Sequence, residues 1–176
     1  EEDLAVYYQD EPANYERTFA NGRTLHFNVA PTPEGGYVNI VTDITERKRA
    51  EQALRESEEQ VRLLLNSTAE AIYGIDMDGE CTFSNPVCVA MMGYDGAEDL
   101  LGRHMHDLIH HTRPDGTPYP KEECLIYQAF REGEGTHVDN EGLWRKDGTS
   151  FAAEYWSYPI KRDDRVIGAV VTFLDI

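Results

Sequence analysis

The segment Asp43-Ile44-Thr45-Glu46-Arg47-Lys48-Arg49 constrains the fold most, because the hydrophobic period of the chain changes there. Before it, apolar residues alternate along the chain, as at Leu25, Phe27 and Val29, which is typical of a half-buried strand. After it, they recur at helical spacing. The sequence then closes on Asp175-Ile176, again after an alternating segment. A sheet that ends in Asp-Ile and continues into a charged helix indicates a relay between modules rather than a self-contained enzyme.

Composition excludes several classes of protein. A length of 176 residues allows one domain plus a fragment, or two small domains, and the start at Glu1 predicts a piece of a longer protein. Thirty-three acidic against 16 basic residues give a formal net charge of -17, which repels phosphate backbones and predicts no binding to nucleic acid. No apolar run reaches about 18 residues, so we expect no direct membrane contact. Three cysteines without CxxC spacing fit a reducing cytoplasm better than a disulfide framework.

The N-terminal part is expected to form an incomplete sheet. Residues 15–19, 23–30 and 36–42 are predicted strands, and Asn21-Gly22 is predicted to make the first hairpin turn, since both residues tolerate positive φ. Three strands with one apolar face need a cover.

Residues 43–70 are predicted to form a helix, because they contain neither Gly nor Pro and are rich in helix formers. Apolar and small residues follow alternating steps of four and three, the spacing of a two-helix seam. We expect a dimeric coiled coil, and the alternative is a linker helix packed on one of its own domains. The predicted seam contains Ala50, Leu54, Ser57, Val61, Leu64 and Thr68.

A second module follows the helix. Residues 71–84 are predicted to form a two-stranded hairpin that turns at Asp78-Gly79. Several short helices are predicted within residues 85–135. Three further strands are predicted at residues 136–145, 149–159 and 165–174. The first sheet also resembles the end of this module. In this internal repeat Leu25, Phe27 and Val29 match Phe151, Ala153 and Tyr155.

The second module resembles the PAS sensor family with its C-terminal PAC segment. The resemblance rests on Tyr73-Gly74-Ile75-Asp76, Asp78-Gly79, Phe83-Ser84-Asn85-Pro86, Met92-Gly93-Tyr94, Leu101-Gly102-Arg103, Trp144-Arg145-Lys146-Asp147-Gly148-Thr149 and Asp175-Ile176. It implies an α+β fold, a five-stranded antiparallel sheet with helices on one face, in a tandem PAS region like those of bacterial histidine kinases and diguanylate cyclases. The expected domains are the end of a preceding PAS module at 1–45, a signalling helix at 46–70 and a complete PAS domain at 71–176.

The resemblance also implies a polar bridge at each Asp-Ile junction. Asp43 is expected to pair with Arg23, and Asp175 with Arg145 or Lys146. Thr45 is expected to act as the N-cap of the helix. The alternative is a solvated surface pair of little energetic weight.

The inward face of the second module is expected to be either a filled core, which is favoured, or a ligand pocket. Tyr155 and Ser157 are its polar positions and the expected contacts for a small molecule, because buried hydroxyls need partners. The candidate pocket residues are Tyr73, Phe83, Met91, His110, Tyr127, Phe130, Phe151, Tyr155, Ser157 and Phe173.

No metal site or large cofactor is predicted, although several candidate ligands occur. His106 and His110 are spaced i,i+4 and can share one helix face, within a set that also includes His104, His111, Glu122, Glu123 and Cys124. Haem-binding relatives carry a histidine on the long helix before the third strand, and residues 121–128 contain none. Flavin photosensors carry a cysteine in the region that resembles 101–107, which has none. Cys124 is interpreted as a small buried hydrophobe.

The opposite face of the sheet is predicted to be an interface. Large apolar side chains there imply a cover, either the helix beginning near Glu51 or a second subunit, and the alternative is a few isolated exposed groups. The predicted interface contains Trp156, Tyr158, Val170 and Leu174.

These features predict a sensory and dimerising segment of a cytoplasmic signal-transduction protein, with a homodimer and the other domains of the same protein as partners. A ligand-free structural PAS spacer is the alternative, and a haem- or metal-binding redox or gas sensor is less favoured. The sequence has no Walker loop, nucleophile elbow, GGDEF-like segment or kinase ATP-lid motif, so no catalytic residue is predicted.

Overall fold

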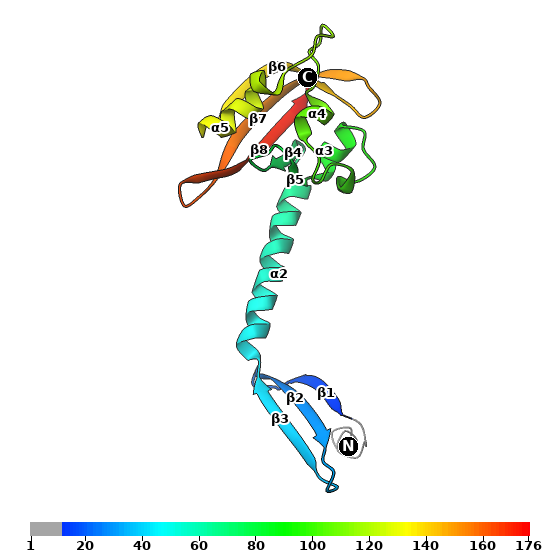
Figure 1. Ribbon diagram of the computed structural model, residues 1–176, viewed down its shortest axis with the longest axis vertical. Coiled ribbons are helices and arrows are strands. Elements are labelled where there is room, and N and C mark those ends of the chain that lie inside the picture. Colours follow the sequence, from blue (N-terminus) through cyan, green and yellow to red (C-terminus); the bar gives the residue numbers. More distant parts are fainter. Residues whose placement is uncertain (1–11) are drawn as a thin grey trace. The chain divides into compact units, whose positions relative to one another are not determined.

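A computed structural model describes residues 12–176, so the first eleven residues of the predicted N-terminal module lie outside the described part. The chain divides into two compact units, residues 1–61 and 62–176. In the first, β1 (Ala13–Thr18), β2 (Thr24–Pro31) and β3 (Tyr37–Asp43) form an antiparallel sheet in that order (Figure 1). Gly22 has a φ of 79° at the first hairpin, as the Asn-Gly turn predicts. Among the described residues, nothing buries β3, whose seven residues are all exposed.

The helix α2 (Thr45–Asn66) follows directly. It confirms the predicted change of period but ends four residues before the expected limit, where the Ser67 and Thr68 hydroxyls donate to the Leu64 and Leu65 carbonyls at 3.0 and 3.1 Å. Thr68 therefore lies outside the helix, and its assignment to the seam is wrong. The exposed fractions of Leu54, Val61 and Leu64 are 60%, 55% and 62%.

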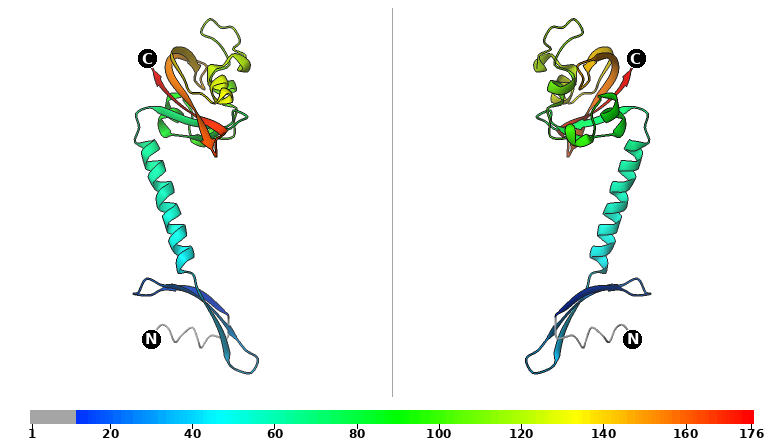
Figure 2. Two further views of the ribbon diagram at one scale, coloured as in Figure 1. Left: turned by 90° about the vertical axis from the view of Figure 1, so that its left-hand side faces the viewer. Right: turned by 90° about the vertical axis from the view of Figure 1, so that its right-hand side faces the viewer.

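The second unit has the expected α+β architecture. Its five strands are β4 (Ala71–Ile75), β5 (Cys81–Ser84), β6 (Thr136–Trp144), β7 (Ser150–Arg162) and β8 (Arg165–Asp175), which form an antiparallel sheet in the order β5-β4-β8-β7-β6. The helices α3 (Pro86–Met91), α4 (Met105–Ile109) and α5 (Leu125–Glu132) gather on one face of this sheet (Figures 1 and 2). Short 3₁₀ turns at η2 (Ala97–Asp99) and η3 (Lys121–Glu123) connect them.

The side chains on the inner face form a filled core. Tyr73, Phe130, Phe151, Tyr155, Ser157 and Phe173 are buried as predicted, and Met91 packs against them half-buried. Phe83 is the exception. A bulge between Gly74 and Ile75 pairs Phe83 with Gly74, so its ring covers Gly74 on the outer face and Cys81 takes the inner position. The inward assignment of Phe83 is wrong because the sequence shows no sign of the bulge.

The strand registers correct the alignment of the internal repeat. Asp43 pairs with Leu25, whereas Asp175 pairs with Ala153. Leu25 therefore corresponds to Ala153 rather than to Phe151. The shift is two residues, so it preserves which face each side chain occupies.

The outer face carries the four apolar residues that the sequence places there. Trp156, Tyr158, Val170 and Leu174 alternate with buried positions along β7 and β8. Part of their cover is internal, because Trp156 stacks on His137 with ring centroids 4.6 Å apart. Within residues 12–176, no helix combines the length and apolar character needed to cross a membrane.

Candidate functional site

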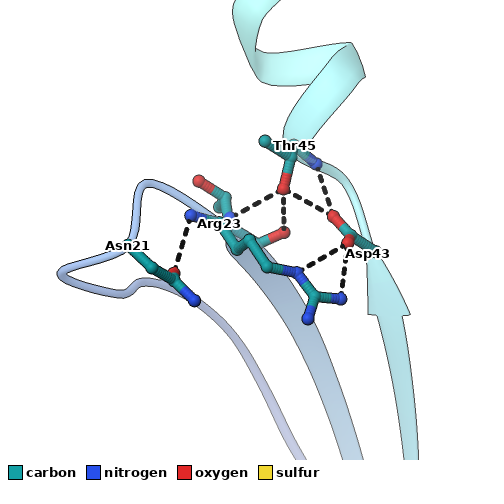
Figure 3. A network of polar contacts seen from close by, with 5 residues as sticks. Asn21, Arg23, Asp43 and Thr45 are labelled. Atoms are coloured by element: carbon teal, nitrogen blue, oxygen red, sulfur yellow. Dashed lines mark hydrogen bonds and ion pairs between the residues drawn. The ribbon is translucent and has the colours of Figure 1, made fainter.

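The first candidate site is the junction where β3 meets α2. The Arg23 guanidinium donates from Nε and Nη2 to Asp43 Oδ2 at 3.1 and 2.8 Å, so the expected pairing is present (Figure 3). Asn21 Oδ1 accepts from the Arg23 backbone N–H at 3.1 Å, which ties the hairpin turn to the same network.

Thr45 belongs to this network in a different role from the one expected. Its hydroxyl accepts from the Thr24 N–H at 2.9 Å and donates to Asp43 Oδ1 at 2.5 Å, while its own N–H donates to Asp43 Oδ1 at 3.0 Å. The N-cap assignment is wrong, because Thr45 is the first helical residue and Asp43 satisfies the first free N–H. Hydrogen bonds from the Thr45 hydroxyl and from Arg23 lower the pKa of Asp43 to about 2.

The C-terminal end of β8 repeats part of this arrangement. Arg145 Nη2 donates to Asp175 Oδ2 at 2.6 Å, and the Ile176 N–H bonds to Ala152 much as the Ile44 N–H bonds to Thr24 in the first unit. Lys146 does not take part. It binds Asp95 and Asp99 at 2.8 and 3.4 Å, because the hairpin turns its side chain toward η2, so its assignment to the junction is wrong.

Asn85 binds the last turn of α2 and the segment after it to the start of α3, and the sequence analysis did not select it. Its side chain is 1% exposed. Oδ1 accepts from the Ile72 and Cys88 N–H groups at 2.9 Å each, and Nδ2 donates to Leu65 and Glu70 carbonyls at 3.1 and 2.9 Å. The available signal was Asn before Pro at the start of a predicted helix, which indicates an N-cap.

A cavity of about 20 Å³ lies between the sheet and the helices, room for about one water molecule. Of the predicted pocket residues, Tyr73, His110 and Tyr127 line it, whereas the other buried ones belong to the packed core beside it. The remaining lining residues are Ile75, Gly79, His104, Met105, His106, Ile109, Cys124 and Ile126.

The polar side of this cavity is a histidine–cysteine cluster formed by His106, His110 and Cys124. One ring nitrogen of each histidine and Cys124 Sγ all lie within 4.8 Å of one another. His106 belongs to α4, His110 is its C-cap, and Cys124 is the extended residue before α5. Cys124 is buried as expected, but its Sγ lies 3.3 Å from His110 Nδ1, so the interpretation as a simple hydrophobe is wrong.

Glu141 completes the surroundings of His110. It follows a bulge in β6, and Oε2 lies 3.2 Å from His110 Nε2 and accepts from the Tyr155 hydroxyl at 2.5 Å. Burial opposes the charged form of both partners, but their mutual attraction outweighs it. The His110 ring lowers the pKa of Glu141 to about 2, and Cys124, followed by Glu141, raises the pKa of His110 to about 9. Burial and the Glu141 carboxylate raise the pKa of Tyr155.

The sequence could reveal only part of this cluster. The i,i+4 spacing of His106 and His110 is visible in the chain. The loop between α4 and η3 brings Cys124 close to His110, and the bulge in β6 brings Glu141 close to it. Neither the loop nor the bulge follows from a periodic pattern in the sequence.

Comparison with known proteins gives two matches to the family described as PAS fold, over residues 59–176 and 1–52. The probable diguanylate cyclase DgcE of Escherichia coli K12 is 31% identical over 140 residues, 79% of this chain and 12% of the relative. Sensor protein CitS of Halalkalibacterium halodurans is 26% identical over 118 residues, 66% of this chain and 19% of the relative.

Solved structures show the same fold. The PAS domain of an HTR-like protein from Haloarcula marismortui superposes with a TM-score of 0.57 at 20% identity, covering 73% of this chain and 99% of that one. The chain thus spans under a fifth of each curated relative named above. On the match over residues 59–176 and the five-stranded sheet within them, the chain belongs to the PAS-fold family of sensor domains.

Proposed function

We propose that the chain is a sensory and dimerising PAS segment of a cytoplasmic signal-transduction protein. In this proposal, α2 passes a change in ligand or partner state to an output domain of the kind found in histidine kinases or diguanylate cyclases. The segment itself carries no catalysis, and its partners are a second copy and the other domains of its own protein. No large cofactor is required.

The observation that carries the proposal is the network at Asp43. It holds the first residue of α2 to two strands through Arg23 and Thr45, so a shift in those strands changes the direction in which the helix leaves the sheet. An element whose position responds to a sheet in this way is what a relay needs.

The apolar seam of α2 supports dimerisation. Ala50, Leu54, Val61 and Leu64 recur at coiled-coil spacing, and the three larger side chains are more than half exposed in the single chain. A second copy of the helix would bury them.

Sedimentation of matched variants tests the dimer. Leu54→Glu places a charge in the seam, whereas Leu63→Glu places the same charge off the seam on a leucine with nearly the same exposure, 59% against 60%. We expect the native chain and Leu63→Glu to be dimers and Leu54→Glu to dissociate. A native chain that stays monomeric at high concentration, or equal behaviour of the two variants, would contradict the proposal.

The filled core favours a second candidate function, a ligand-free structural spacer. A cavity of about 20 Å³ leaves little room for an organic ligand in this conformation. Native mass spectrometry of freshly purified protein distinguishes the two. An added mass larger than that of a metal ion supports the sensor, and a dimer without such an addition supports the spacer.

A further inference from the structure

We propose that His106, His110 and Cys124 bind a first-row transition metal ion of the Zn²⁺ class at the wall of the cavity. This inference concerns what the cavity holds, and it depends neither on the dimer nor on a relay through α2.

The hydrogen bonds of His106 leave one ring nitrogen free for a metal. Nε2 lies 2.9 Å from the Tyr119 carbonyl oxygen, which can only accept, so Nε2 carries the hydrogen. Nδ1 is buried and, among residues 12–176, has no hydrogen-bond partner. A histidine that donates one N–H to a backbone carbonyl and keeps the other nitrogen bare is the usual state of a metal ligand.

His110 lies between the other two groups. Its Nε2 is 3.2 Å from the Glu141 carboxylate, an ion-pair distance without hydrogen-bond geometry, and its Nδ1 faces Cys124 Sγ at 3.3 Å. Metal–nitrogen and metal–sulfur bonds of about 2.0–2.1 and 2.3 Å place N and S about 3.6 Å apart in a tetrahedral site. The observed separation of the two atoms is already close to that value.

The charges also suit a divalent ion. Metal binding releases to solvent the one proton that His110 Nδ1 and Cys124 Sγ share, leaving a neutral imidazole and a thiolate as ligands. The ion and the thiolate together carry one positive charge, and the Glu141 carboxylate behind His110 balances it. A buried site with no net charge avoids most of the cost of desolvation.

The donor set and the cavity define the class of ion. Two imidazoles and one thiolate suit Zn²⁺ and its neighbours rather than Mg²⁺ or Ca²⁺, which prefer oxygen. Three protein ligands leave a fourth position, and a cavity of about 20 Å³ beside them can hold a water molecule there.

Titration of the full chain with Co²⁺ tests the site, because tetrahedral Co²⁺ absorbs in the visible and a bound thiolate adds a near-ultraviolet charge-transfer band. The reduced, chelator-stripped protein should develop both bands to one equivalent, and Zn²⁺ should remove them. Glu141→Gln should weaken Co²⁺ binding about 10–100-fold, since it removes only the carboxylate that orients His110. Cys124→Ser should abolish the charge-transfer band, and His106→Gln should weaken binding more than Glu141→Gln does.

Matched controls separate the site from adventitious binding and from misfolding. Cys88→Ser removes another buried thiol and His111→Gln another histidine of the same region, and both should bind Co²⁺ as the native chain does. If circular dichroism shows Cys124→Ser unfolded, His106→Gln, on a half-buried residue, decides the outcome. A native chain without the charge-transfer band, a band that survives in Cys124→Ser, or equal binding by His106→Gln and the native chain would overturn the inference.

Discussion

Replacing Asn85 by alanine is expected to lower the free energy of unfolding of the second unit by about 2–4 kcal/mol. The Asn85 side chain links three segments that are separate in the chain. It satisfies the Ile72 N–H of β4 and the Cys88 N–H of α3, and it donates to a carbonyl in the last turn of α2 and to one in the segment before β4. No other single side chain described above joins the end of α2 to the core.

The magnitude follows from the groups that lose their partner. The Ile72 and Cys88 residues are buried, so water cannot readily replace the lost acceptor, and an unsatisfied buried donor costs about 1–3 kcal/mol. The Cys88 contact is also the N-cap of α3, whose removal costs about 1 kcal/mol. The carbonyls of Leu65 and Glu70 belong to more exposed residues and can bind water, so their loss adds little.

Urea denaturation followed by tryptophan fluorescence measures this loss in the right unit, because Trp144 and Trp156 are the two tryptophans of the chain and both lie there. The matched control is Ser84→Ala, which alters the neighbouring half-buried residue. It removes a long contact of 3.4 Å to the Asn85 carbonyl and an interaction with the Cys88 thiol, and it should cost less than about 1 kcal/mol. A loss below about 1 kcal/mol in Asn85→Ala, or equal losses in the two variants, would refute the assignment of Asn85 as the link.

Three further outcomes are expected. Gly168→Ala should destabilise the second unit by about 1–3 kcal/mol in urea denaturation, because the new Cβ would lie 2.1 Å from a backbone oxygen of β4. The control Gly148→Ala places its Cβ where no atom lies within 4 Å, so it should cost only about 1 kcal/mol of backbone strain. The lowered pKa of Asp43 stabilises the first unit at pH values above the unfolded pKa of 3.8, and this stabilisation should be lost as the pH falls through about 2. Acid titration followed by circular dichroism should show this loss, and the Asp43→Asn variant should lack it. Burial raises the pKa of Cys81 to about 11 and of Cys88 to about 12, so intact-mass analysis should find both unmodified by iodoacetamide at pH 7.5 until urea unfolds the chain.

The parts of the fold that follow a local period could be predicted from the sequence. The change from alternation to helical spacing at Asp43 marks the end of β3 and the start of α2 within about two residues. The turns at Asn21-Gly22 and Asp78-Gly79 lie where residues that tolerate positive φ interrupt alternating segments, and Gly22 and Gly79 have φ values of 79° and 87°.

The errors arise where tertiary structure overrides a local rule. Phe83 faces outward because a bulge in the β4–β5 pair reverses the alternation that placed it inward. Lys146 could not be separated from Arg145 in the sequence, because the acidic partners of Lys146 lie about fifty residues earlier in the chain. The approach of Cys124 to His110 is likewise set by a loop, so spacing alone could not associate them.

The two sheets differ most at the centre and least at the junction. When the strands are matched through Asp43 and Asp175, Phe27 of the first sheet occupies the position of Tyr155 in the second. Phe27 stacks on Tyr15 with ring centroids 5.0 Å apart. Tyr155 instead donates a hydrogen bond to Glu141, which contacts His110 in the wall of the cavity. Both junctions nevertheless keep an arginine on the terminal aspartate. This arrangement fits the proposed relay, in which the junction transmits and the centre detects. Detection has to suit one ligand, whereas transmission needs only a strand end that both sheets share.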